Sequence, residues 1–210
     1  TDAAIAPELL QGCLQHAVDA SFNAISIDGD TSTNDACVLA AAGTLGNPPL
    51  ADPAQPEFTA FQQALEAVCG ELAEAIVRDG EGATKLVRIE VSEAASISEA
   101  RQVAATIAHS PLVKTAFFAS DPNWGRILAA VGRAGVLGLA IERVRIWLDE
   151  VRIVANGERD PDYTEAAGRQ VMANDHFRIH VQLGRGNAQA FLLTCDLSYD
   201  YARINAEYRT

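Results

Sequence analysis

Segments with helical spacing of apolar residues alternate with strand-like segments along the whole chain of 210 residues. The helical pattern covers residues 7–22, 57–78, 98–108, 124–133 and 164–172. The strand-like runs cover residues 24–27, 36–42, 85–91, 113–119, 144–154, 177–183 and 190–198. Such mixing excludes an all-α bundle and an all-β sandwich. It predicts an α/β or α+β protein, a layered sandwich in which mixed sheets pack against helices.

The composition adds constraints on the core and on partners. Hydrophobic residues make up 49% of the chain but aromatic residues only 6%, so the core must rest on Ala, Val, Ile and Leu. This balance is ordinary for a soluble α/β protein and argues against disorder. The net charge is −12, from 28 acidic and 16 basic residues, and such a field repels a polyanion. We therefore expect no nucleic-acid partner.

The four cysteines and four histidines do not form a metal motif. No CxxC pair occurs, and no histidine stands at zinc-ligand spacing from a cysteine, so we expect no structural metal and a reducing compartment. No apolar run approaches the length of a membrane span, and no charged, apolar leader opens the chain. We expect a cytoplasmic protein with no membrane association. A sub-boundary near Ala140 is considered, although no shift in composition marks it.

Three polar, glycine-bearing segments interrupt the apolar elements. The first, Asp28 to Asp35, reads DGDTSTND and carries several carboxylates and hydroxyls. A calcium loop of the EF-hand type would need a glutamate at its end, where this chain is apolar, so calcium is not expected. Two interpretations stay open, a loop that binds a polar ligand and a set of Asx-type turns that cap themselves.

The second segment, Arg78 to Lys85, places a glycine on each side of Glu81. Glycines allow the backbone to come close to whatever Glu81 faces, and a carboxylate there can take up a substrate ammonium. The alternative is a solvated turn between a helix and a strand. A phosphate cradle is not expected, because the segment follows the C-terminal end of a helix, where the dipole repels anions.

The third segment, Ser120 to Arg126, joins a strand-like run to a helical one. Asp121 and Asn123 can cap the first helical turn, and the helix N-terminus can also offer N–H groups to a carboxylate. Arg126 can point into a site or pair with an acid. A Ser-His-Asp site has no local support, since G-x-S-x-G is missing.

Four motifs together resemble the β half of the ornithine acetyltransferase family, the bifunctional glutamate N-acetyltransferase/amino-acid acetyltransferases. They are NAISIDGDTSTND (23–35), RDGEGATK (78–85), SDPNWGR (120–126) and CDLSYDYARINAEYRT (195–210). The resemblance runs in the same order, covers the whole chain and ends at the same C-terminus. It implies an ornithine acetyltransferase/DmpA-like sandwich, with residues 1–210 forming the β chain, the C-terminal part of a self-cleaved precursor.

The resemblance also implies an activity. In this family the precursor cuts itself before a threonine, and the α and β chains stay together. The freed threonine takes the acetyl group of N-acetylornithine, releases ornithine and passes the acetyl group to glutamate, a step of arginine biosynthesis. No cofactor is implied, although some members also accept acetyl-CoA as a substrate. The α-amine of an N-terminal threonine, with a pKa of about 8, can act as base for its own hydroxyl.

One departure concerns the nucleophile. Thr1-Asp2-Ala3 matches a Thr-Asp-Ala that follows the family's nucleophile further along the β chain, and it does not match the cleavage site. We therefore expect the nucleophilic threonine to lie just upstream of residue 1, with Thr1 itself as the remaining alternative. The chain alone should then be inactive, because both this residue and the oxyanion hole, which the family places on the α chain, lie outside it.

The family's substrate contacts fall on Glu81, Asn205 and Thr210. The expected partners are the α chain in an α2β2 heterotetramer and the substrates N-acetylornithine, glutamate and ornithine. Two other function classes stay open. One is a self-processing amidohydrolase or aminopeptidase, which would use water as the acceptor. The other is a non-catalytic amino-acid-binding or assembly domain whose polar loops are only turns.

Overall fold

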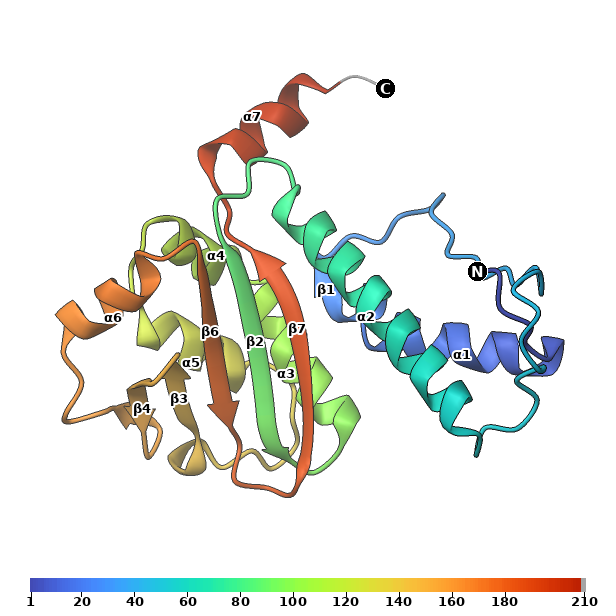
Figure 1. The fold of residues 1–210 in the computed structure, drawn as a ribbon. Helices are drawn as coiled ribbons and strands as arrows, with labels where there is room; N and C mark the ends of the chain where they lie inside the picture. Colours follow the sequence, from blue (N-terminus) through green and yellow to red (C-terminus); the bar gives the residue numbers. More distant parts are fainter. Residues whose placement is uncertain (209–210) are drawn as a thin grey trace. The chain divides into compact units, whose positions relative to one another are not determined.

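The computed structural model describes residues 1–208, and it divides into two compact units (Figure 1). The first unit comprises residues 1–25 and 31–75. The second comprises residues 26–30 and the described chain from residue 76 onward. Ala140, near which a sub-boundary was considered, lies inside the second unit.

The first unit contains helix α1 (Pro7–Asp19), the 3₁₀ helix η1 (Phe22–Ala24) and most of helix α2 (Pro56–Arg78). Proline is the first residue of α1, where its missing N–H has no intrahelical partner to lose. The small apolar side chains of Cys13, Ala17, Cys69 and Ala73 are buried. The two helices predicted in this part of the sequence are confirmed.

The strand predicted over residues 36–42 is wrong. This stretch has no regular secondary structure, and the side chain of Val38 is 84% exposed. Among the described residues, its backbone bonds reach the N-terminal segment: the amino group of Thr1 donates to the carbonyl oxygen of Ala40 (2.8 Å), and the Ala42 N–H donates to the Thr1 carbonyl oxygen (3.0 Å). An apolar run forms a strand only where a neighbouring strand completes the ladder, and none does so here.

The described residues form a seven-stranded mixed sheet in the order β1-β7-β2-β6-β3-β4-β5. The strands are β1 (Ile25–Ser26), β2 (Leu86–Ala94), β3 (Arg145–Leu148), β4 (Val151–Ala155), β5 (Glu158–Arg159), β6 (His176–Gln182) and β7 (Ala188–Cys195). Strand β2 runs parallel to β6 and antiparallel to β7. This mixed sheet with its helices confirms the predicted fold class.

Strand β2 shows why one face of the sheet is covered. Val87, Ile89 and Val91 alternate along the strand and are fully buried, whereas Arg88 and Glu90 point to the other face and are partly exposed. Helices α3 (Ile97–Ala108), α4 (Pro111–Phe118) and α5 (Trp124–Gly132) pack behind the sheet (Figure 1). The buried face of the strand, whose side chains alternate with a period of two, therefore packs against the apolar stripes of the helices in one core.

Helix α4 corrects the strand predicted over residues 113–119. Pro111 starts the helix, and Val113, Ala116 and Phe117 bury one helical face. A short apolar run fits both the helical period and the strand period. Pro111, which favours the first turn of a helix, was therefore the better indication of this element. The cap predicted for the next helix is confirmed, because Asn123 Oδ1 accepts the Arg126 N–H (3.1 Å). Helices α6 (Glu165–Met172) and α7 (Tyr199–Glu207) complete the unit.

Within residues 1–208, no helix is both long enough and apolar enough to cross a membrane. The same residues contain no group of three or more His, Cys, Asp or Glu side chains placed to hold a metal ion.

Candidate functional site

The loop that carries Glu81 lies against the start of the C-terminal helix α7. Gly82 has a φ of +64°, a left-handed conformation that favours glycine. A Cβ at Gly82 would lie 2.6 Å from the Tyr201 backbone nitrogen and 2.7 Å from Ser198 Oγ. The sequence pattern predicted a close backbone approach at this loop. The partner that approaches is the chain's own C-terminal segment.

Asp196, at the end of β7, holds this loop in place. Its carboxylate is 3% exposed and accepts three hydrogen bonds: from the Thr84 N–H (2.8 Å), the Thr84 hydroxyl (2.7 Å) and the Lys85 N–H (2.9 Å). The Ser198 hydroxyl adds a bond to the Gly82 carbonyl oxygen (2.6 Å). Residues more than a hundred positions apart thus fix the backbone on which Glu81 stands, while its side chain stays exposed.

Tyr201 joins the first polar segment to this loop. Its hydroxyl donates to Asp28 Oδ2 (2.9 Å). The pKa of Tyr201 is raised to about 12, first by burial, then by the hydrogen bond to Asp28 and by the negative charges of Asp28, Glu81 and Asp30. These charges act on the phenol only because they lie near it. Asp28, Glu81 and Tyr201 therefore form one acidic cluster, in which an ammonium group would be stabilised.

The predicted substrate contacts have different surroundings. Asn205 is exposed on α7, one helical turn beyond Tyr201, and its Nδ2 donates to the Tyr201 carbonyl oxygen (3.0 Å). Glu81 thus stands on the loop that lies against α7 near Tyr201, and Asn205 stands on α7 itself. Thr210 lies outside the described residues. Thr1 belongs to the first unit.

Beside this cluster, Ser26 Oγ and His109 Nε2 are 2.9 Å apart. The pKa of His109 is lowered, mainly by partial burial and also by the charge of Lys114, although the negative charge of Asp28 opposes the shift. This arrangement favours a neutral imidazole. Together these residues provide an acidic surface with a neutral histidine nearby, and nothing in them is an activated nucleophile.

Comparison with known proteins identifies the family of the chain that carries these residues. The model of the ArgJ family matches residues 1–210. The chain belongs to the ArgJ family. It is 66% identical to the arginine biosynthesis bifunctional protein ArgJ of Methylococcus capsulatus and 53% identical to that of Psychrobacter arcticus, over all 210 residues in both cases. These alignments cover 51% and 52% of the two relatives, so the chain spans about half their length.

A solved ArgJ structure confirms the fold. The crystal structure of the arginine biosynthesis bifunctional protein ArgJ from Bacillus halodurans superposes with a TM-score of 0.92 at 41% identity, covering 99% of this chain and 96% of that one. The family resemblance inferred from the four motifs is therefore confirmed.

Two residues of this chain were missed by sequence reasoning. Asp196 stood out only as part of a motif, and Lys114 only as part of an apolar run. Lys114 is 3% exposed, and its Nζ donates to Thr194 Oγ1 (3.0 Å) and to the Cys195 carbonyl oxygen. Burial lowers its pKa, and the Cys195 thiol and Asp196 oppose this effect. A lone charge within the apolar PLVKTAFF was the available signal, because such a charge must be paired when it is buried.

Arg126, which the sequence left as a candidate site residue, links two helices instead. Its Nη1 donates to the carbonyl oxygen of Leu112 on α4 (2.8 Å), and its own N–H takes part in the cap of α5.

Proposed function

We propose that this chain is the β chain of a self-processing acetyltransferase that moves the acetyl group of N-acetylornithine to glutamate in arginine biosynthesis. The observation that carries the proposal is the docking of the Glu81 loop against α7, through Asp196, Ser198 and Tyr201, in a chain of the ArgJ family. This docking brings the segment of Glu81 next to the segment of Asn205.

The proposed reaction uses a threonine just upstream of residue 1. Its hydroxyl attacks the acetyl carbonyl carbon of N-acetylornithine, and its own α-amine takes the hydroxyl proton. The tetrahedral intermediate collapses, the bond from the acetyl carbon to nitrogen breaks, and the leaving amine receives that proton. The glutamate amine then attacks the threonine ester, so the acetyl group leaves as N-acetylglutamate and the hydroxyl is restored.

Residues of this chain bind and orient the amino acids in that scheme. The exposed carboxylate of Glu81 accepts hydrogen bonds from a substrate ammonium, and the nearby negative charge of Asp28 reinforces this preference. Asn205 and Thr210 provide polar contacts to the other end of the substrate. The oxyanion hole belongs to the α chain. Such positioning lowers the entropic part of the barrier.

The wider assignment is also part of the proposal. The chain works with the α chain of its own precursor in an α2β2 assembly in the cytoplasm. The relatives are about twice as long as this chain, which fits a two-chain precursor. The name of these relatives includes the word bifunctional, and acetyl-CoA as a second acetyl donor to glutamate would give a second activity.

Intact-mass analysis of the full αβ protein tests the acetyl-enzyme. After incubation with N-acetylornithine, the β chain should gain the mass of one acetyl group and lose it when glutamate is added. Repeating the measurement with acetyl-CoA tests the second donor. An absence of any gain would overturn the proposal, and release of free acetate without transfer would favour the amidohydrolase instead.

The same experiment tests Glu81. A Glu81→Gln variant should still cleave its precursor but should form the acetyl-enzyme at least about tenfold more slowly, because a charge-assisted bond to the substrate is lost. Glu142→Gln is the matched control, since Glu142 is an exposed glutamate on the 3₁₀ helix η2 (Ile141–Arg143). Equal rates in the two variants would remove Glu81 from the site.

A further inference from the structure

The first residues of the chain run parallel to a later segment of the first unit. The amino nitrogen of Thr1 donates to the Ala40 carbonyl oxygen (2.8 Å), and the Ala42 N–H donates to the Thr1 carbonyl oxygen (3.0 Å). This is the bond pattern of a parallel pair in which Thr1 stands opposite the residue between those two. A bridge between Ile5 and Leu50 is parallel as well, so both contacts give the pairing the same direction.

The apolar run that begins this pairing is open to a longer partner upstream of Thr1. Residues 36–42 have no regular secondary structure, and the Val38 side chain is 84% exposed. Within residues 1–208, the N–H groups of Val38 and Ala40 and the Val38 carbonyl oxygen make no hydrogen bond. A parallel ladder that continued upstream would use these groups next, because its bonds fall on every second residue. An apolar run with unpaired backbone groups is a template for a further strand.

The register of such a strand follows from the pair of Thr1 and Ala41. Partners in a parallel ladder advance together, so the residue n positions before Thr1 stands opposite residue 41 − n. The nearest five positions face residues 36–40, whose side chains carry no oxygen or nitrogen. The sixth and seventh positions before Thr1 face Asp35 and Asn34, the first polar side chains of the run. A threonine whose hydroxyl reacts needs a polar neighbour to hold it, which favours these two positions.

Asn34 suits a nucleophile that relies on its own α-amine better than Asp35 does. Successive side chains of a strand point to opposite faces, so the threonine is the neighbour of one of the two and not of both. A carboxylate opposite the threonine would stabilise the protonated α-amine and keep it from acting as a base. A neutral amide has no such effect and can still donate a hydrogen bond to the hydroxyl oxygen.

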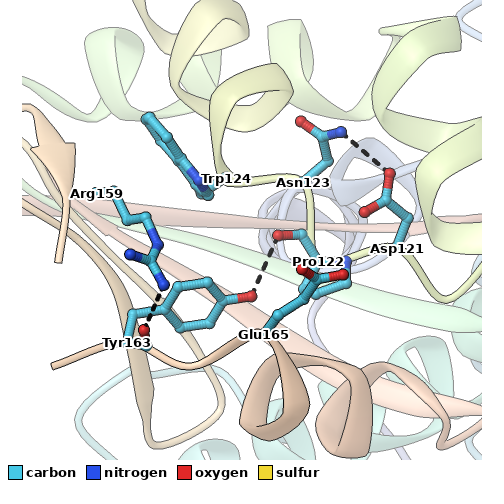
Figure 2. A pocket seen from close by; sticks show the side chains of 7 residues that line it. All are labelled: Asp121, Pro122, Asn123, Trp124, Arg159, Tyr163 and Glu165. Carbon is cyan, nitrogen blue, oxygen red and sulfur yellow. Dashed lines mark hydrogen bonds between the residues drawn. The ribbon is translucent and has the colours of Figure 1, made fainter. Parts of the chain in front are cut away.

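The side-chain amide of Asn34 is available for such a bond. The residue is exposed, and within residues 1–208 its Nδ2 and Oδ1 make no hydrogen bond. Asn123 shows the contrasting case, since its Nδ2 donates to Asp121 Oδ2 (3.0 Å; Figure 2) and its Oδ1 accepts the Arg126 N–H (3.1 Å). The amide of Asn123 is therefore fixed in a helix cap, whereas the amide of Asn34 can bind a new partner.

We propose that the segment preceding Thr1 pairs in parallel with residues 34–40, and that Asn34 positions the nucleophilic threonine, seven residues before Thr1. This inference rests on the proposed function, and the relatives, about twice as long as this chain, have the length for such a segment. Neighbouring strands lie about 4.8 Å apart, with paired side chains on the same face. Asn34 Nδ2 then donates to the threonine Oγ, so that the hydroxyl hydrogen is directed to the α-amine. Asn34 is a positioning residue, and the amine remains the base.

A disulfide tests the register, because Cys37 is a native, exposed thiol on this run. It stands opposite the fourth residue before Thr1, so a cysteine placed there should bond to it under mild oxidation of the full αβ protein. Cysteines at the third and fifth positions are the matched controls and should stay reduced, because their side chains point to the other face. Alkylation of free thiols followed by intact-mass analysis measures this. No bond at the fourth position, or equal bonding at all three, would overturn the register.

The pH dependence of acetyl-enzyme formation tests the role of Asn34. Asn34→Ala should slow formation at least about tenfold with little change in KM, because the substrate contacts remain. Asn34→Asp places a negative charge beside the α-amine and favours its protonated form. The rising limb of the pH–rate profile should therefore move up by about one pH unit, which a purely structural role would not cause. Asn187→Asp, the same change of charge at an exposed position between β6 and β7, is the matched control.

Two results would remove Asn34 from the site: a limb that does not move in Asn34→Asp, or one that moves equally in Asn187→Asp. If the unaltered protein formed no acetyl-enzyme, the proposed function would fail and this role would fail with it. The disulfide requires no turnover, so it decides the register in either case. Thermal unfolding of each variant checks that it is folded.

Discussion

The two polar loops that the sequence picked out, residues 28–35 and 78–85, both carry carboxylate, threonine and glycine residues but are held in different ways. In the first, most bonds are local: Ser32 Oγ accepts the N–H groups of Asn34 and Asp35, at 3.2 Å each. In the second, Thr84 and Lys85 bond to Asp196, more than a hundred positions away. The difference indicates that distant partners, and not polar composition, decide which loop is fixed for binding.

The strongest test of this comparison is Asp196→Ala. Two backbone N–H groups and one hydroxyl would lose a buried acceptor, so we expect the free energy of unfolding to fall by about 3 kcal/mol and amide exchange at Thr84 and Lys85 to accelerate. Urea unfolding and hydrogen exchange measure these effects.

The control lies in the other loop. Ser32→Ala removes the two local bonds at an exposed position and should change stability by no more than about 0.5 kcal/mol. If the two variants proved equally destabilised, the comparison would fail.

Gly82→Ala tests the close approach of α7 separately from the hydrogen bonds. The left-handed backbone and the short distance to the Tyr201 nitrogen should together cost about 2 kcal/mol and loosen α7. Gly46→Ala is the control, since Gly46 has a φ of +76° but no atom within 4 Å of the position that a Cβ would occupy. Its cost should be about 1 kcal/mol, from backbone strain alone. Thermal unfolding of both variants provides the measurement, and equal losses would mean that contact with α7 adds nothing.

Much of the fold could be predicted because its periods are long and clear. The apolar stripe of α2 fits a helix alone, and the alternation of β2 fits a strand alone. The short runs 36–42 and 113–119 were both predicted as strands, and neither is one. The first has no neighbouring strand and the second begins at Pro111, so tertiary context and a local helix signal outweighed apolar composition.

The residues of the site likewise divide into those that a local sequence pattern reveals and those that it does not. Glu81 could be found from its flanking glycines together with the family resemblance. Asp196 could not, because its three donors stand 111 and 112 positions earlier and no local pattern connects them. Helix α7 was also missed, because the C-terminal segment looks like a tail in the sequence, although Ser198 caps the helix by accepting the Tyr201 N–H (3.4 Å).

Tyr201→Phe should have the smallest effect, because its hydroxyl makes one hydrogen bond, from α7 to Asp28 in the loop at residues 28–35, worth about 1 kcal/mol. The pKa of Tyr201 is raised from 10.0 to about 12, so folding favours the neutral phenol. This contribution to stability is complete below pH 10.0 and is lost as the pH rises through about 12. The pKa of Tyr163 is also raised by burial, so ultraviolet titration of tyrosinate should show a late step that loses part of its amplitude in Tyr201→Phe and keeps it in Tyr208→Phe, a change at a side chain that is 72% exposed. If the late step kept its full amplitude in Tyr201→Phe, Asp28 would not be bonded to this tyrosine, and the loop at residues 28–35 would then be held by local bonds alone.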